Sequence, residues 1–190
     1  PWLLVAVVWL AFFWQLGAVP LYDLDEGAFT EATREMLASG NFITPHQDGE
    51  PRYDKPVLIY WAQAASASLL GFNEFALRLP SAVAASLWVL ALWLFVRARL
   101  DAGTATVAGL AMALSLEIGI IGKGAVADAL LNLFIALAFF DIYRWRLQPR
   151  RGTLLRVYLW LGLGFLTKGP VAVFFPLIVS LLYFASYRGL

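Results

Sequence analysis

The chain contains no cysteine and a single histidine, His46, among 190 residues. Without a thiol it can form no disulfide framework, no cysteine-ligated iron–sulfur centre and no cysteine nucleophile. One histidine excludes a metal centre built from several histidines of this chain. Charged residues are also scarce, at 14%, where soluble domains carry about 25%. So few charges cannot cover the surface of a protein of this size in water, which indicates a lipid environment.

Apolar residues fill most of the chain: 61% are hydrophobic, 15% are aromatic, and the mean hydropathy is +0.73. A helix needs roughly 20 residues to span the hydrocarbon core of a bilayer. Lipid offers backbone groups no hydrogen-bonding partner, so spanning segments must be helical. We therefore predict an all-α polytopic membrane protein with about six spans. The apolar stretches cover residues 2–18, 75–96, 104–121, 126–143, 157–167 and 171–187.

The two ends of the sequence favour a fragment of a longer protein. There is no initiator methionine, no basic lead-in and no small-residue cleavage site near residues 1–25, so we expect no signal peptide. The last apolar stretch ends close to Leu190. We expect residues 1–190 to be the N-terminal part of a transmembrane domain whose C-terminal remainder is absent.

Basic residues predict the orientation of the chain. They follow the second, fourth and sixth apolar stretches, which lie on one side if the spans alternate. The positive-inside rule makes that side cytoplasmic. The N-terminus is then cytoplasmic as well, and the first loop, residues 19–74, is extracytoplasmic. The residues concerned are Arg97, Arg99, Arg144, Arg146, Arg150, Arg151, Arg156 and Arg188.

The first loop holds nine of the 13 acidic residues. Within it, apolar side chains recur with a helical period over residues 26–37, and Ser39-Gly40-Asn41 ends that pattern. A second helix is predicted from Pro56, a favoured first helical residue, to Gly71. Both segments are too short or too polar to span, so we expect two juxtamembrane helices at the membrane surface.

Asp25 and Glu26 open the first of these helices and allow two interpretations. Asp23 as N-cap with Glu26 at the third helical position would form a capping box. Alternatively, Asp25 is a general base, or a carboxylate that orients an acceptor, at the membrane surface. The local pattern leaves both open.

Asp54-Lys55-Pro56 precedes the second helix. A cation at Lys55 stands at the positive end of the helix dipole, which is unfavourable unless both bind an anion such as phosphate. The simpler alternative is an Asp54–Lys55 pair at the surface, which contributes little.

Asp128 begins the fourth apolar stretch and Lys168 follows the fifth. Ionisable residues in membrane segments are candidates for function, although Asp128 could instead serve the helix start and Lys168 could reach the interface with its long stem. His46 is interpreted as an ordinary loop histidine. With the first-loop residues, these groups face outward. An anion site with a base at membrane level suits an enzyme that uses a lipid-linked phosphate.

Two other functions are considered. A transporter or flippase for a lipid-linked or anionic substrate would show broken helices and polar residues near the bilayer midplane, whereas the charges here gather on one face. A non-catalytic scaffold would use the acidic loop only to dock a partner. Nothing in the pattern indicates a nucleic-acid partner.

The motifs LDEGAFTEATREML, RYDKP, GFNEFALRLPS, ADALLNLF and FLTKGP resemble the N-terminal half of bacterial GT-C glycosyltransferases. The similarity is to the protein O-mannosyltransferase-like superfamily, which includes the aminoarabinose transferases that modify lipid A. It implies a multi-pass enzyme of the bacterial inner membrane. Such an enzyme transfers a sugar from a polyprenyl-phosphate donor to a lipid, protein or glycan acceptor.

The same resemblance implies roles for individual residues. Asp25 matches the catalytic aspartate and Asp128 a second acidic residue of the site. Lys55 matches a lysine that holds the donor phosphate, and Asp54 a position that contacts a divalent metal in some members. Ala28 departs from the arginine of the aminoarabinose enzymes, which weakens the case for that particular sugar. The remaining predicted substrate-binding residues are Glu26, Tyr53 and Lys168.

Overall fold

The computed structural model describes residues 2–22 and 25–187; Asp23 and Arg188, which entered the sequence interpretation, lie outside them. The described chain is mostly helical, as predicted, with one small hairpin. The elements are α1 Trp2–Phe12, α2 Asp25–Ser39, β1 His46–Gln47, β2 Glu50–Pro51, α3 Leu58–Leu70, α4 Glu74–Arg97, α5 Ala102–Ala113, α6 Leu116–Lys123, α7 Asp128–Leu147, α8 Arg151–Lys168 and α9 Val171–Tyr187.

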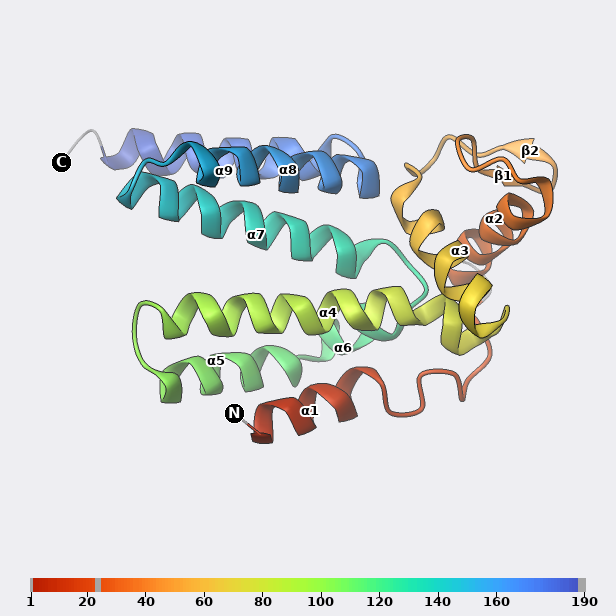
Figure 1. Ribbon diagram of the computed structural model, residues 1–190, viewed down its shortest axis with the longest axis horizontal. Coiled ribbons are helices and arrows are strands. Elements are labelled where there is room, and N and C mark those ends of the chain that lie inside the picture. The colour runs from red at the N-terminus through yellow and green to blue at the C-terminus, as the bar shows by residue number, and fades with distance from the viewer. Residues whose placement is uncertain (1, 23–24, 188–190) are drawn as a thin grey trace.

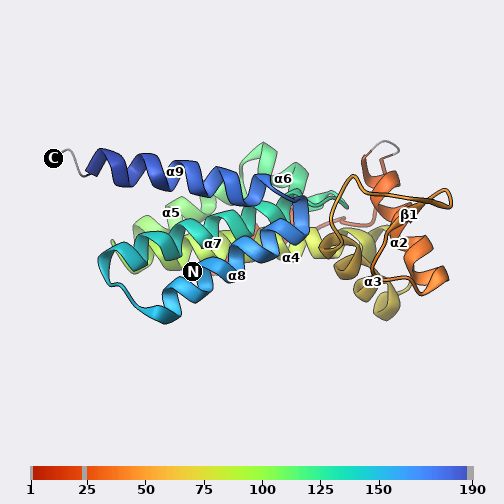
Figure 2. The same cartoon turned by 90° about the horizontal axis from the view of Figure 1, so that it is seen from above.

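The longer helices form a bundle that runs along the long axis of the molecule (Figure 1). Helix α7 packs against α4 on one side and against α8 on the other. Helices α2 and α3 and the hairpin lie together at one end of the bundle, while the α4–α5 and α7–α8 connections lie at the opposite end, as both views show (Figures 1 and 2). The acidic first loop and the basic connections therefore occupy opposite ends.

Helix α2 confirms the helix predicted over residues 26–37, and Gly40, with φ +70°, follows its end. Its apolar face does not lie free for the membrane surface. Phe29 and Met36 are buried against Ile59 and Tyr60 of α3. Helix α3 begins at Leu58, two residues after the predicted Pro56 start. The two helices therefore form a packed pair, because each covers the apolar stripe of the other.

The hairpin is a departure from the all-α prediction. His46 pairs with Pro51 and Gln47 with Glu50, joined by Asp48-Gly49, both with positive φ (56° and 79°). Two residues with positive φ are typical of a type I′ turn, for which Asp-Gly is a favoured sequence. The signal was present in the sequence, but strands of two residues leave no alternating pattern to reveal them.

The predicted span over residues 104–121 is wrong as one continuous helix. The chain breaks between Ala113 and Leu116, and α5 and α6 meet at an angle of 65°. Among the described helices, α4 alone is long and apolar enough to cross a membrane by itself, and α5 with α6 would make a second if the bent pair counts as one span. Helices α7 and α8 reach 20 and 18 residues but carry charged residues near their ends.

Small residues allow α6 to approach its neighbours. A Cβ atom added at Gly122 would lie 2.9 Å from Cδ1 of Phe12 and 3.0 Å from Cβ of Ala85. Side chains with no room to move cannot accommodate such contacts without shifting helices. By contrast, nothing lies within 4 Å of the corresponding position on Gly119. Gly122 therefore fixes how closely α6 packs against α1 and α4.

We predict that Gly122→Ala destabilises the folded protein by about 1–3 kcal/mol, as overpacking generally does. The matched control is Gly119→Ala in the same helix, which should leave stability unchanged or raise it slightly because alanine favours helices. Thermal unfolding of the two variants in detergent measures the difference. Equal melting temperatures for both would contradict the close packing at Gly122.

Candidate functional site

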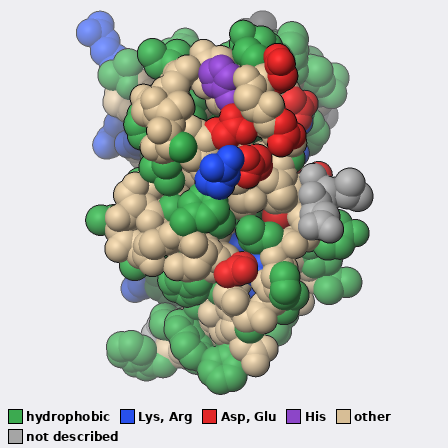
Figure 3. Space-filling view, turned by 90° about the vertical axis from the view of Figure 1, so that its right-hand side faces the viewer, with side chains coloured by type: hydrophobic (Ala, Val, Ile, Leu, Met, Phe, Trp, Pro, Cys, Tyr) green, Lys and Arg blue, Asp and Glu red, His purple; other side chains and the backbone are tan. Residues whose placement is uncertain are grey.

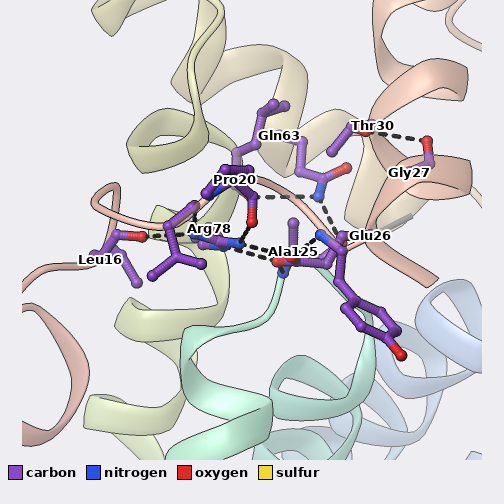
Figure 4. A network of polar contacts seen from close by, with 11 residues as sticks. Leu16, Pro20, Glu26, Gly27, Thr30, Gln63, Arg78 and Ala125 are labelled. Carbon is purple, nitrogen blue, oxygen red and sulfur yellow. Dashed lines mark hydrogen bonds and ion pairs between the residues drawn. The ribbon is translucent and has the colours of Figure 1, made fainter. Parts of the chain in front are cut away.

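A buried ion pair joins the first loop to the helix bundle. Glu26 of α2 and Arg78 of α4 are 6% and 7% exposed. Arg78 Nη2 donates to Glu26 Oε2 at 2.7 Å and Arg78 Nε to Glu26 Oε1 at 2.8 Å (Figure 4). This two-bond geometry fixes the orientation of both planar groups.

The remaining donors of Arg78 bind backbone carbonyls in the segment between α1 and α2. Its Nη1 donates to the oxygens of Leu16 (3.1 Å) and Val19 (2.7 Å), and its Nη2 to that of Pro20 (3.0 Å) (Figure 4). One guanidinium therefore holds the α1–α2 connection against α4. Only arginine offers enough donors in a fixed plane to do this.

The Glu26 carboxylate accepts two further hydrogen bonds. The backbone N–H of Tyr22 donates to Oε2 at 2.8 Å, and that of Ala125 donates to Oε1 at 2.7 Å. The first contact resembles the capping interpretation of Glu26, although Asp23 lies outside the described residues. The second fixes the α6–α7 connection, which is distant in sequence. The pair thus organises three segments and α4 around one point.

A second polar network supports the same connection. Gln63 of α3 is fully buried; its Nε2 donates to the carbonyl oxygens of Ala125 (3.1 Å) and Leu77 (3.3 Å). Thr33 of α2 donates to Gln63 Oε1 at 2.8 Å. The backbone at Ala125 is therefore held from both of its polar groups, by Glu26 and by Gln63.

Burial by itself raises the pKa of the Glu26 carboxyl group, but the hydrogen bonds from Arg78, Tyr22 and Ala125 outweigh it, so its pKa lies below the ordinary value of 4.5. Glu26 is thus ionised at neutral pH. A carboxylate that already accepts four hydrogen bonds is a poor proton acceptor, which separates its chemistry from that of its neighbour Asp25.

Next to this ion pair lies a cleft of about 540 Å³. Its walls come from the start of α2, the segment before α3, the α6–α7 connection, the start of α7 and the end of α8. Five of the residues singled out in the sequence line it together, although they are separated by up to 143 positions: Asp25, Glu26, Lys55, Asp128 and Lys168.

Some charged side chains of the cleft form ion pairs, and one carboxylate does not. Lys168 Nζ lies 2.5 Å from Asp128 Oδ1, so the end of α8 is tied to the start of α7. Lys55 Nζ lies 3.1 Å from Asp54 Oδ1. Asp25 is exposed and enters none of the ion pairs found in residues 2–22 and 25–187. Of the carboxylates that line this cleft, it is the one left without a cation among the described residues.

Lys123 is a lining residue that the sequence interpretation did not select. Its Nζ donates to the backbone oxygen of Trp14 at 2.9 Å, beside the cleft. With Lys55 and Lys168 it makes a third ammonium group along the walls. A lysine at the end of an apolar stretch was the available signal, but nothing in the sequence indicated that it would line the same cleft as Lys55.

Two predicted site residues do not line the cleft. Tyr53 is 84% exposed. Asp54 is exposed too, and its carboxylate binds Lys55 and, at 3.2 Å, Arg52. The hydrogen bond from Lys55 lowers the pKa of Asp54 below its ordinary value, and Arg52 adds to the effect. Asp54 is therefore neutralised by cations of the chain itself.

The position predicted to contact metal, Asp54, is not part of a carboxylate cluster. Within the described ranges, the one set of three such side chains close enough to share an ion is Glu31, Glu35 and Asp48, whose oxygens lie within 4.8 Å of one another. It lies over α2 and the hairpin, where acidic side chains gather on the end of the molecule (Figure 3). The residues around Asp54 do not fit a bound divalent cation.

A helical bundle of this kind, with the cleft at one end, is that of a GT-C-type protein, as the matches to known proteins show. The chain belongs to the family described as dolichyl-phosphate-mannose-protein mannosyltransferase, whose profile matches residues 54–189. It is 33% identical over 194 residues to an undecaprenyl phosphate-alpha-4-amino-4-deoxy-L-arabinose arabinosyl transferase of Aeromonas salmonicida, covering 100% of this chain and 36% of that protein. An uncharacterised protein of Aquifex aeolicus is 30% identical over 98% of this chain and 44% of its own length.

Solved structures agree with these relatives. The fold matches ArnT from Cupriavidus metallidurans in the apo state with a TM-score of 0.91 and 25% sequence identity, over 98% of this chain and 36% of that one. The crystal structure of the same protein bound to undecaprenyl phosphate matches with the same TM-score, and the match covers 35% of that solved chain. The chain thus spans about a third of the length of the arabinosyl transferases that it matches.

We predict that Glu26→Gln destabilises the protein by about 3–5 kcal/mol, because it leaves the Arg78 charge buried without its partner. Thermal unfolding in detergent measures the loss. The matched control is Glu31→Gln on the same helix, which removes an exposed partner of Arg34 and should change the melting temperature little. If Glu26→Gln melted as the control does, the ion pair would not be the anchor of the first loop.

Proposed function

We propose that this chain forms part of a membrane glycosyltransferase that moves a sugar from a polyprenyl-phosphate donor to an acceptor on the extracytoplasmic side. One observation carries the proposal: a single cleft at the end of the helix bundle combines the exposed carboxylate of Asp25 with the ammonium groups of Lys55, Lys123 and Lys168. A phosphate leaving group needs the cations, and an acceptor hydroxyl needs the carboxylate.

The cations of the cleft suit the donor phosphate. Lys55 stands three residues before α3, whose N-cap residue, Val57, makes no side-chain cap. Free backbone N–H groups and a nearby lysine attract a phosphate. As the bond between the anomeric carbon and the phosphate oxygen breaks, negative charge grows on the phosphate. Fixed positive groups then stabilise the transition state more than the ground state.

Asp25 has the position of a general base. In the proposed reaction it accepts the proton of an acceptor hydroxyl while that oxygen attacks the anomeric carbon from the side opposite the phosphate. The glycosidic bond forms with inversion, and the polyprenyl phosphate leaves with the bonding electron pair. Asp25 lies next to Glu26, whose ion pair with Arg78 fixes the start of α2. Glu26 therefore serves as a positioning residue.

Asp128 and Lys168 complete the proposed site. Their ion pair places an ammonium group beside the cleft and links α7 to α8, so we assign Asp128 to positioning and Lys168 to the donor. Tyr53, exposed two residues before Lys55, is assigned to contacts with the bound substrate. No step is proposed through a metal at Asp54, because Arg52 and Lys55 occupy its carboxylate.

The relatives indicate which donor to test first. The names of the arabinosyl transferases among them specify undecaprenyl phosphate-linked 4-amino-4-deoxy-L-arabinose as the donor. One of the matching crystal structures contains undecaprenyl phosphate. We propose an undecaprenyl phosphate-linked sugar as donor and lipid A as the first acceptor to examine. Ala28 replaces the arginine expected of the aminoarabinose enzymes, so related sugars belong in the same assay.

The fold is consistent with insertion in the bacterial inner membrane. Helix α4 would span it, α5 and α6 would form a broken span, and α7, α8 and α9 would run beside them. The end with α2, α3 and the cleft would face the periplasm. The end with the basic α4–α5 and α7–α8 connections would face the cytoplasm, as the positive-inside rule requires.

We predict that Asp25→Asn in the full-length protein lowers the rate of sugar transfer by roughly 10²–10⁴-fold, the usual contribution of a general base. Mass analysis of the acceptor, with undecaprenyl-phosphate sugar as donor, measures the rate. Membrane insertion and melting temperature should stay normal, because Asp25 is exposed. Asp48→Asn in the hairpin, outside the cleft, is the matched control and should leave transfer intact.

Near-normal transfer by Asp25→Asn would remove Asp25 from the reaction. The same assay, run in vesicles, separates the rival function. A flippase would carry labelled donor across the bilayer without forming a glycosylated acceptor. For a flippase, any effect of Asp25→Asn would be on the rate of transport of the donor.

We predict that Lys55→Gln raises the KM for the donor by roughly 10- to 100-fold, since a hydrogen bond to a charged group contributes about 1.5–3 kcal/mol. Lys55→Arg, which keeps the positive charge, should recover most of that loss. Initial rates at varied donor concentration provide the measurement. An unchanged KM in Lys55→Gln would show that the donor phosphate binds elsewhere.

A further inference from the structure

A second and larger cleft, of about 1020 Å³, lies at the end of the bundle opposite the proposed catalytic site. It is formed by the end of α4, the chain leading into α5, the end of α7 and the start of α8, elements that meet at one end of the molecule (Figure 1). The proposed transferase chemistry makes no use of it.

Arginines dominate the polar lining of this cleft. Four of them face it from α7, α8 and the two connections: Arg99, Arg144, Arg150 and Arg156. Two of them, Arg144 and Arg156, bind the carboxylate of Asp141, which is 2% exposed. The cleft therefore carries a surplus of positive charge.

Asp141 arranges two of these arginines. Arg156 donates to its oxygens from Nε (2.9 Å) and Nη2 (3.0 Å), and Arg144 Nη1 donates at 3.0 Å. Trp160 Nε1 adds a fourth bond at 2.9 Å. One negative charge thus holds two guanidinium groups at the cleft wall and neutralises only one of them.

Arg99 and Arg150 take part in none of the ion pairs among the residues that the structure describes. The Arg99 guanidinium lies against the rings of Phe95 and Tyr143, 4.5 and 4.7 Å from their centroids. Its Nε atom is buried and has no hydrogen-bond partner in the described part of the chain. Aromatic contacts hold the cation in place and leave its other N–H groups available to an anion.

The start of α8 adds to the positive field. Arg150, its N-cap residue, makes no side-chain cap. Gly152 lines the cleft, and nothing lies within 4 Å of the position that its Cβ would occupy. At the start of this 18-residue helix the N–H of Thr153 donates to the carbonyl oxygen of Arg150 at 3.1 Å. The N–H groups that precede it are therefore the ones left for an anion beside the arginines, an arrangement that favours phosphate.

Most of the other lining side chains are apolar. Phe95, Val96, Leu100 and Leu147 line the cleft with the arginines, and Leu100 and Leu147 are exposed. A free phosphate would gain nothing from such walls. A phospholipid brings a phosphate for the arginines and acyl chains for the apolar side chains, and basic pockets between membrane helices recognise lipid headgroups in this way.

We propose that this cleft binds the phosphate of an anionic phospholipid from the leaflet next to the basic end of the bundle. The proposal rests on the membrane orientation given under the proposed function, not on the transferase chemistry. The positive-inside rule alone would be satisfied by basic side chains exposed in the cytoplasmic loops. Here a buried carboxylate and two aromatic rings hold three of the four guanidinium groups at a cavity, which that rule does not require.

The test uses the purified full-length protein in neutral detergent. It is titrated with short-chain phosphatidylglycerol, phosphatidylcholine or inorganic phosphate, and bound molecules are counted by native mass spectrometry. The wild-type protein should prefer phosphatidylglycerol to both others. Arg150→Gln should weaken that binding by roughly fivefold, and Arg99→Gln with Arg150→Gln by roughly 25-fold, at about 1 kcal/mol for each charge.

Arg97→Gln is the matched control, because Arg97 lies at the same end of α4 against Trp93 and outside this cleft. It should bind phosphatidylglycerol as the wild type does. Arg150 is exposed, so the single variant separates a loss of binding from a loss of folding. The proposal is overturned by equal binding of phosphatidylcholine, by tighter binding of inorganic phosphate, by equal losses in Arg97→Gln and Arg150→Gln, or by no lipid binding at all.

The lipid-binding measurement does not depend on sugar transfer. An Asp25→Asn protein should therefore keep its preference for phosphatidylglycerol while losing transfer. Conversely, a protein that transfers no sugar in any form would still give a clear result for this cleft.

Discussion

The buried pair of Glu26 and Arg78 is the interaction on which the rest of the proposed site depends. It joins α2 to α4, and its additional hydrogen bonds reach the α1–α2 and α6–α7 connections. A buried ion pair contributes little net stability when both desolvation penalties are counted. Its main contribution is to the geometry of the fold. Any arrangement of these segments that separates the two side chains leaves a buried charge without a partner, so such arrangements are strongly disfavoured. Asp25, Lys123 and Asp128 all stand within three residues of a position that this pair or its neighbouring network holds.

Much of the fold follows from local sequence patterns. The helical period over residues 26–37 and Gly40 predicted α2 closely, and the apolar stretches predicted α4, α7 and α9 within a few residues, because lipid-facing and core-facing helices carry strong composition signals. The break between α5 and α6 was missed, since residues 104–121 are mostly apolar and the single Ser115 at the break does not by itself show where a helix bends. The hairpin was missed because two-residue strands have no period.

The site was predictable as a set of residue types but not as a geometry. Local chemistry marked Asp25, Lys55 and Asp128 as unusual, and they line one cleft. The partner of Arg78 could not be read from the sequence, because 52 positions separate it from Glu26 and several acidic residues were available. The same limitation placed Glu26 among substrate contacts, although its oxygens are occupied by the fold. Lys123 was missed for a related reason: its importance comes from its neighbours in space.

The two ends of the bundle use the same physical device. At one end, Glu26 holds Arg78, so the start of α2 is fixed and Asp25 is left exposed at a cleft. At the other end, Asp141 holds Arg144 and Arg156 at the wall of a second cleft. In both places a buried carboxylate with saturated hydrogen bonds positions groups that remain available to a ligand. Because charged groups are costly in the apolar middle of such a bundle, both proposed binding sites lie where the helices end. A phosphate that belongs to a lipid reaches either end without leaving the bilayer.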